Sequence, residues 1–172
     1  MSGSGYNLSR VRVLIVDDNK NMREIIRSML EAFGVSKFRE AEEGEVGYKR
    51  FVEFNPDLVI CDWNMEPVDG VEFTRRVRNN EDSPNRFVPL IMLTANTEAH
   101  HVVQARDVGV KEYLAKPLSA QSLYQRISAA IESPRPFVRT KTYFGPDRRR
   151  KRKGDYEGPE RRVSDQEANA AD

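Results

Sequence analysis

Five side chains suited to phosphate chemistry come directly after short apolar stretches of this sequence. In chain order they are Asp17, Asp18, Asp62, Thr94 and Lys116. Crowded carboxylates repel one another and bind a hard divalent cation, and oxygen ligands with room for water favour Mg²⁺. An ionised carboxylate attacks phosphorus without a general base, while a lysine and a threonine nearby can stabilise the phosphoryl oxygens. The set therefore predicts uptake of a phosphoryl group on Asp62, with the backbone carbonyl of Asn64 as a further metal ligand.

Each of these residues also has an ordinary structural explanation when it is considered alone. Two aspartates before a helix commonly cap its N-terminus, and an aspartate or a Lys-Pro pair is common in loops. The functional interpretation requires a sheet in which four different strands end at the same edge.

Apolar runs alternate with helical patterns from residue 11 to about residue 133. The predicted strands are 11–16, 37–41, 57–61, 88–93 and 110–115. The predicted helices are 22–33, one that contains Val46, Phe51 and Val52, 69–79, about 97–107, and 118–131. Five such units predict an α/β fold with a five-stranded, doubly wound parallel sheet covered on both faces. Because its crossovers are right-handed, all strands end along one edge, where such sheets bind ligands.

These motifs resemble the CheY-like receiver domains of response regulators over about residues 10–132. The resemblance is carried by Val-Leu-Ile-Val-Asp17-Asp18, Cys61-Asp62-Trp63-Asn64-Met65, Leu93-Thr94-Ala95 and Tyr113-Leu-Ala-Lys116-Pro117. It implies a flavodoxin-like fold, with Asp62 as the phosphoacceptor. It also implies that Mg²⁺ is held by Asp17, Asp18 and Asp62.

The same resemblance implies a phosphate switch made of Thr94, Lys116 and Tyr113. In it Thr94 moves toward the phosphate and Tyr113 turns inward, and the output face is formed by the fourth helix, the fifth strand and the fifth helix. The phosphoryl group would come from a histidine kinase or another phosphodonor. Since an aspartyl phosphate is a signal state and not turnover of an external substrate, we do not expect the chain to be an enzyme.

One loop departs from the receiver pattern. Where the family generally has Met-Pro soon after the phosphoacceptor, this chain has Met65-Glu66-Pro67. Glu66 adds negative charge beside the predicted site. The alternative that the acids serve only the fold therefore stays open.

The net charge of +1 hides a strong asymmetry along the chain. Residues 1–134 carry a net charge of −3, residues 135–162 a net charge of +7, and the last ten residues a net charge of −3. A basic block of this kind indicates an anionic ligand or partner. The basic segment has no apolar periodicity that would build a core, so its length and composition disfavour a separate DNA-binding domain.

The basic segment contains an internal repeat. Residues 143–149, Tyr-Phe-Gly-Pro-Asp-Arg-Arg, return as residues 156–162, Tyr-Glu-Gly-Pro-Glu-Arg-Arg. Arginine binds the O6 and N7 atoms of guanine in a bidentate manner, the acid can accept from its opposite edge, and aromatic rings stack on bases. Two copies match the two guanines of cyclic di-GMP. The predicted nucleotide-binding residues are Tyr143, Asp147, Arg148, Arg149, Arg150, Tyr156, Glu160, Arg161 and Arg162.

Two other interpretations of this segment stay open, a solvated basic tail and nonspecific nucleic-acid binding through phosphates. The tail also resembles that of the Cle-type proteins, CheY-like cyclic di-GMP effectors of motility. This resemblance implies docking on the flagellar motor switch protein and control of swimming or surface attachment. The alternative function is a single-domain phospho-receiver in chemotaxis or other two-component signalling.

The predicted organisation has four parts: residues 1–9 as an N-terminal tail, 10–132 as the receiver domain, 133–163 as an arginine-rich ligand-binding tail, and 164–172 as an acidic disordered end. The tail is expected to be flexible and to order on the nucleotide. The single cysteine cannot form an internal disulfide, and no stretch is long and apolar enough for membrane insertion. We therefore expect a cytoplasmic protein, with recruitment to the flagellar motor or the cell pole as a further expectation.

Overall fold

The computed structural model describes residues 5–95, 103–104, 106–110, 112–132, 137–141 and 143–146. Its elements in chain order are β1 (Arg12–Val16), α1 (Lys20–Ala32), β2 (Lys37–Ala41), α2 (Gly44–Phe54), β3 (Leu58–Asp62), α3 (Gly70–Asn79), β4 (Leu90–Thr94), β5 (Glu112–Ala115), α5 (Ala120–Glu132), β6 (Phe137–Arg139) and β7 (Phe144–Pro146). Residues 103–104 and 106–107, in the predicted helix before β5, are also helical. All predicted nucleotide-binding residues except Tyr143 lie outside the described residues.

The first five strands form one parallel sheet in the order β2-β1-β3-β4-β5. The chain leaves β1 toward β2 on one side and returns to β3 on the other, so the order reverses at β1. This confirms the predicted doubly wound, flavodoxin-like sheet. The carboxyl ends of β1 and β3, which flank the reversal, are the place where such sheets bind ligands.

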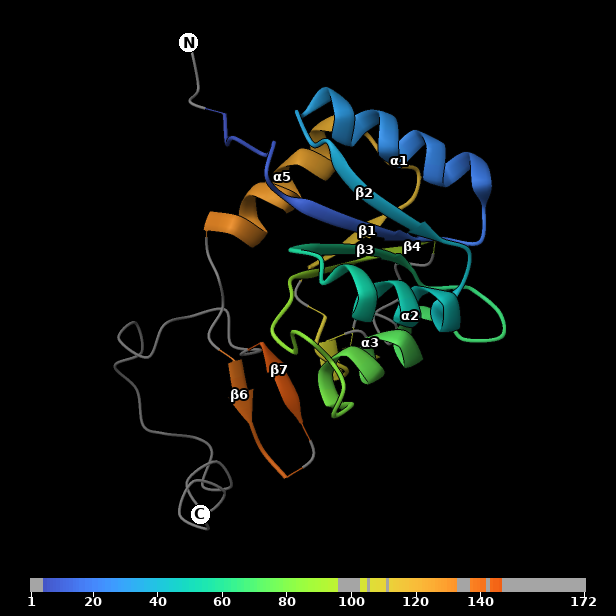
Figure 1. Ribbon diagram of the computed structural model, residues 1–172, viewed down its shortest axis with the longest axis vertical. Coiled ribbons are helices and arrows are strands. Elements are labelled where there is room, and N and C mark those ends of the chain that lie inside the picture. The colour runs from blue at the N-terminus through green and yellow to red at the C-terminus, as the bar shows by residue number, and fades with distance from the viewer. Residues whose placement is uncertain are drawn as a thin grey trace.

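Two apolar layers cover the sheet (Figure 1). Helices α1 and α5 pack on one face and α2 and α3 on the other. Alternate residues of β1 point to opposite faces, since Val13 and Ile15 join the α1 and α5 layer while Leu14 and Val16 join the α2 and α3 layer. All four side chains are fully buried, as the nearly continuous apolar run predicts for a central parallel strand.

A two-stranded antiparallel hairpin follows the receiver fold and was not predicted from the sequence. In this hairpin β6 pairs with β7, and it lies on the same side of the sheet as α3. The rings of Phe137 and Phe144 contact each other and the ring of Phe87, with centroids 5.0 to 5.7 Å apart, and Phe87 is still 58% exposed. Part of the predicted tail is therefore packed on the receiver by an aromatic cluster.

Gly145 brings the hairpin close to the receiver backbone. A Cβ atom at this position would lie 2.8 Å from the Cα of Gly109 and 2.6 Å from the Tyr143 hydroxyl. Gly109 itself has a φ of +92°, a conformation that favours glycine. The two glycines therefore form the contact at which β7 meets the receiver.

Within the part of the chain that the structure describes, no helix has the length and apolar character needed to cross a membrane.

Candidate phosphorylation and metal site

The structure brings the predicted acids and the lysine together at the carboxyl edge of the sheet. One carboxylate oxygen from each of Asp17, Asp18 and Asp62 lies within 4.8 Å of the others. The Lys116 Nζ lies 3.0 Å from Asp62 Oδ1 and 3.5 Å from Asp17 Oδ2. Asp17 and Asp62, which are 45 positions apart in sequence, thus lie close together and both contact Lys116.

Local structure at the end of β1 fixes the first two acids. Asn19 is the N-cap of α1, and its side chain accepts a hydrogen bond from the Met22 amide. The Asn19 amide donates to Asp17 Oδ1 at 2.8 Å, and the Arg23 guanidinium donates to the Asp17 carbonyl at 2.7 Å. The helix start therefore orients the Asp17 carboxylate and holds its backbone, while Asp18 stays exposed.

Asp62 is the last residue of β3 and is held by the start of α3. The Gly70 amide donates to the carbonyl of Trp63 at 3.0 Å. A Cβ atom on Gly70 would lie 2.3 Å from the Asp62 carbonyl oxygen, so only glycine permits this approach. The position of Asp62 thus depends on a backbone contact between its strand end and the first helical residue of α3.

Burial decides the electrostatics of the site. It raises the pKa of Asp62 above the ordinary value, the hydrogen bond from Lys116 partly opposes this, and the charge of Asp17 raises the pKa further. Burial also raises the pKa of Asp17, against the Asn19 amide and Lys116, which lower it. For Lys116, burial acts to lower the pKa, but its hydrogen bond to Asp62 and the two carboxylates outweigh it and the pKa is raised. One lysine therefore faces two buried carboxylates, Asp17 and Asp62, whose charged forms burial disfavours.

This donor set fits Mg²⁺. All three candidate ligands are carboxylates, which hard divalent cations prefer, and the exposed Asp18 leaves the site open to water. A bound cation would favour the charged forms of Asp17 and Asp62, whose pKa values burial raises. Asn64 lies in the loop after β3 and is exposed, and its carbonyl as a metal ligand stays a prediction.

The predicted switch residues lie on or directly after β4 and β5, the two strands beyond β3 in the sheet order. Thr94 ends β4 and is buried, and its carbonyl accepts a hydrogen bond from the Lys116 amide at 2.9 Å. Tyr113, in β5, is half-buried and packs against the α2 and α3 layer of the core. Glu66, the extra acid of the loop, is exposed and is not among the described acids whose oxygens cluster.

Tyr143, the described member of the predicted nucleotide-binding set, is buried within the hairpin. It is 7% exposed, and its hydroxyl donates to the Pro146 carbonyl at 2.8 Å. Its ring therefore supports β7 in this structure and does not present a face to solvent.

Sequence reasoning missed the residues that support the site. Asn19, Arg23 and Gly70 act through backbone contacts with the acids or with the loop after β3. An Asx-type cap before a helix is a sequence signal that identifies Asn19. No spacing rule identifies Arg23 as a partner of a carbonyl.

Known proteins match the receiver part of the chain. A family model described as the response regulator receiver domain matches residues 13–128. The chemotaxis protein CheY of Pseudomonas aeruginosa is 33% identical over 122 residues, which are 71% of this chain and 97% of that protein. CheY-3 of Vibrio cholerae is 29% identical over 122 residues, covering 71% of this chain and 92% of that protein.

The fold is shared with a solved chemotaxis protein. The structure of CheY4 from Vibrio cholerae superimposes with a TM-score of 0.63 and 27% sequence identity, over 69% of this chain and 96% of that one. The family match ends at residue 128, so the hairpin and the basic repeat lie outside it. The sheet order, the cluster of acids with its lysine, and these matches together show that the chain belongs to the response regulator receiver domain family.

Proposed function

We propose that this protein is a response regulator that takes up a phosphoryl group on Asp62 and binds cyclic di-GMP through its arginine-rich tail. The observation that carries the first half is the 3.0 Å contact between Lys116 Nζ and the Asp62 carboxylate within a cluster of three acids. The observation that carries the second half is the doubled Tyr-x-Gly-Pro-acid-Arg-Arg sequence.

In the phosphoryl transfer, an Asp62 carboxylate oxygen forms a bond to phosphorus as the bond between phosphorus and the donor breaks. The leaving group stays with the phosphodonor, a histidine kinase or a small phosphorylated molecule. Lys116 already contacts the accepting carboxylate and can follow the charge onto the phosphoryl oxygens. Asp17, Asp18 and Asp62 would hold Mg²⁺, which would neutralise more of that charge. The product is a signal state, and we propose no enzymatic turnover.

The hairpin supports a role for the tail in ligand binding. The first repeat begins inside it, because residues 143–146 of the repeat include all of β7. Asp147 and Arg148 follow directly in sequence after Pro146, the last residue of β7. An arginine in a segment attached to an ordered strand loses less conformational entropy on binding a ligand than an arginine in a fully disordered chain.

Titration of cyclic di-GMP into the full-length protein tests the second half of the proposal. We expect saturable binding that neither GTP nor a short oligonucleotide displaces at equal concentration, because the two repeats match two linked guanines. The alternative of a basic tail that binds any nucleic acid predicts the opposite, displacement by the oligonucleotide and steep weakening with salt. Isothermal calorimetry at two salt concentrations measures both quantities.

We further propose that the protein acts on motility. This rests on the similarity of its receiver to chemotaxis proteins and on the resemblance of its tail to Cle-type effectors. The proposed partner is a flagellar motor switch protein, bound at the receiver face that contains β5 and α5. Recruitment to the motor or the cell pole would follow from that contact.

A further inference from the structure

A cavity of about 700 Å³ lies where the hairpin meets the receiver. Its walls come from α3, the segment before β4, the helical residues 103–104 and 106–107 with the turn that follows, and the β6–β7 hairpin. The residues that line it are Arg75, Arg78, Asn79, Arg86, Val103, Gln104, Asp107, Val108, Arg139, Thr140, Lys141, Tyr143 and Phe144. Pockets that bind nucleotide-sized ligands have volumes of about 300–1,000 Å³. This cavity is distinct from the acidic site, which lies at the carboxyl edge of the sheet.

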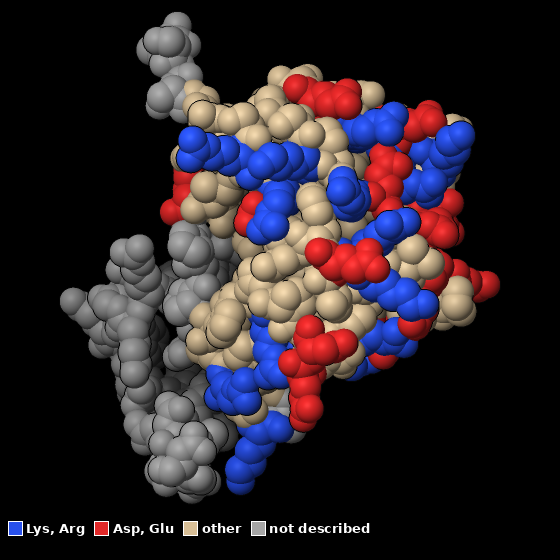
Figure 2. All heavy atoms as spheres, in the orientation of Figure 1, with Lys and Arg blue, Asp and Glu red and all other residues tan. Residues whose placement is uncertain are grey.

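The cavity lining is strongly basic. It includes four arginines and a lysine, against one carboxylate, Asp107, which pairs with Arg106 at 3.7 Å. Figure 2 shows lysine and arginine side chains at the lower edge of the described surface, with acidic side chains directly to their right, whereas both signs of charge alternate over the upper right of the molecule. Among the described residues, Arg86, Arg139 and Lys141 contact no carboxylate. Most of the positive charge of this lining is therefore not balanced within the described chain.

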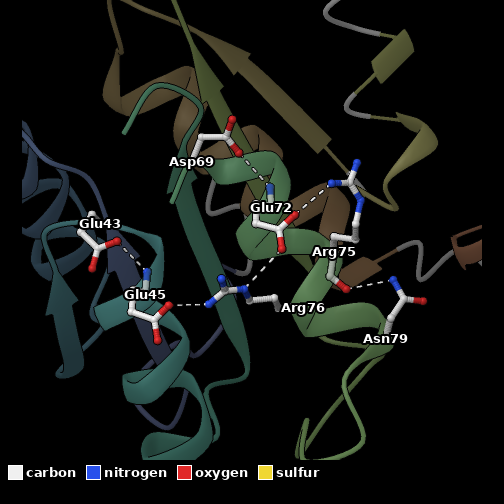
Figure 3. A network of polar contacts seen from close by, with 7 residues as sticks. All are labelled: Glu43, Glu45, Asp69, Glu72, Arg75, Arg76 and Asn79. Carbon is white, nitrogen blue, oxygen red and sulfur yellow. Dashed lines mark hydrogen bonds and ion pairs between the residues drawn. The ribbon is translucent and has the colours of Figure 1, made fainter. Parts of the chain in front are cut away.

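Neighbouring arginines on α3 are balanced, which sets the cavity apart (Figure 3). Arg76 bridges Glu45 at 2.6 Å and Glu72 at 3.4 Å, and Arg75 pairs with Glu72 at 3.0 Å. Glu72 lies between the two arginines and faces both. Glu45 and Glu72 are thus engaged by Arg75 and Arg76, and Arg75 is the one member of the cavity lining that they contact.

Arg78 at the base of the cavity is the second observation that indicates an anion. It is 1% exposed, its Nε donates to the Gly109 carbonyl at 3.0 Å, and one terminal nitrogen donates to the Arg86 carbonyl at 2.8 Å. The other terminal nitrogen is buried and has no hydrogen-bond partner. Burial lowers the pKa of Arg78 to about 9, and its guanidinium lies over the Phe137 ring, 5.1 Å from the centroid. A buried cation with neutral partners alone is costly, and an anion close to it offsets that cost.

We propose that this cavity binds the phosphate groups of the cyclic dinucleotide whose guanines the tail reads, an inference that rests on the proposed function. The position follows from chain continuity, because β7 forms one wall and leads directly into Asp147 and Arg148. Guanidinium and ammonium groups on Arg139 and Lys141 supply charge-assisted hydrogen bonds to phosphodiester oxygens. The receiver arginines Arg75 and Arg86 complete the set from the opposite wall. The nucleotide would then connect the tail to α3 and the segment before β4.

Replacing both Arg139 and Lys141 with glutamine tests the proposal by calorimetric titration of cyclic di-GMP into the full-length protein. We expect affinity to fall by about 100-fold or more, because two hydrogen bonds to charged groups are lost. The charge-preserving pair Arg139→Lys and Lys141→Arg should stay near the affinity of the unmodified protein. A matched control, Lys49→Gln with Arg50→Gln, removes the same charge from two exposed residues of α2 and should have little effect.

A variant on the receiver wall separates binding from hairpin folding. Arg75→Gln leaves the hairpin intact because Arg75 belongs to α3, and it should also weaken cyclic di-GMP binding. Equal affinity for the unmodified protein, the Arg139 and Lys141 double variant and Arg75→Gln would overturn the cavity proposal. If arginine variants of the repeats nevertheless lost binding, the proposed function would stand without the cavity.

A second ligand, inorganic pyrophosphate, tests the cavity independently of the proposed function. If the unmodified protein binds no cyclic di-GMP, inorganic pyrophosphate tests the cavity alone, because it presents the same phosphate oxygens. We expect pyrophosphate to shift the amide signals of residues 106–110, 137–141 and 143–145 in nitrogen-15 spectra of the full-length protein, and the double variant to lose these shifts. Unshifted signals would exclude the cavity as a phosphate site.

Discussion

Replacing Asp62 with asparagine is expected to abolish the uptake of a phosphoryl group from acetyl phosphate. The amide keeps the size of the side chain but removes the nucleophilic oxygen that forms the bond to phosphorus. Incorporation of labelled phosphate into the full-length protein measures the result. Because Asp62 is buried beside Lys116, a thermal unfolding scan on the same variant establishes that the fold is kept.

Glu66 provides the matched control for this experiment. It is an exposed acid in the loop that follows Asp62, and it lies outside the described cluster of carboxylates. Glu66→Gln should therefore still accept the label. Loss of labelling in Glu66→Gln together with undiminished labelling in Asp62→Asn would move the phosphoacceptor to the loop.

Lys116→Met should retain the acceptor but slow labelling by about 100-fold or more, because the cation that contacts Asp62 is removed.

Replacing Arg148, Arg149, Arg161 and Arg162 with alanine is expected to weaken cyclic di-GMP binding by at least about 100-fold. A bidentate arginine contact with guanine contributes about 1–3 kcal/mol, and each repeat supplies its own pair of arginines. Calorimetric titration of the full-length variant measures the loss. Phosphate labelling of Asp62 in the same variant should be unchanged, since the acidic site is formed by the receiver alone.

Two comparison variants distinguish guanine recognition from general charge attraction. Lys151, Arg152 and Lys153 lie between the repeats, so replacing these three with alanine should cost far less affinity than replacing the four repeat arginines. Changing the four repeat arginines to lysine keeps the charge but loses the planar fork, and it should also weaken binding strongly. Similar losses from the inter-repeat and repeat variants would instead favour nonspecific binding through phosphates.

The receiver fold and its acidic site follow from sequence patterns that have a direct physical meaning. The Val11 to Val16 run predicts a strand buried on both faces, and Val13 and Leu14 indeed lie in opposite core layers. Because parallel strands end at one edge, the positions of Asp62 and Lys116 at strand ends were sufficient to predict their contact. The supporting contact between Gly70 and the Asp62 carbonyl depends on the angle at which α3 begins, which local sequence does not encode.

The hairpin and the cavity could not be predicted in the same way. The strands Phe137–Arg139 and Phe144–Pro146 are too short to show an alternating pattern, and they are stabilised by an aromatic contact with the distant Phe87. Arginine is seldom fully buried, so a pattern of helical residues gives no reason to place Arg78 inside the molecule.

The first repeat shows how one sequence feature can carry two roles. Its tyrosine suggested stacking on a base. In the structure Tyr143 and Gly145 instead pack the hairpin against itself and against Gly109. The second repeat, at residues 156–162, has the same tyrosine and glycine but lies outside the described residues. The two tyrosines can therefore differ in role, one packing the hairpin and the other contacting a ligand, although the two repeats are similar in sequence.

The fluorescence of Trp63 tests the central claim, a magnesium and phosphoryl site around Asp62, most directly. Trp63 is the single tryptophan of the chain, is buried, and is the residue next to Asp62. We predict a saturable change when Mg²⁺ is added to the unmodified protein, and a further change when beryllofluoride is added as a phosphoryl mimic. The Asp18→Asn variant should show a much weaker response to Mg²⁺. A signal that does not respond to either addition, in protein that is folded by thermal unfolding, would contradict the assignment of this site.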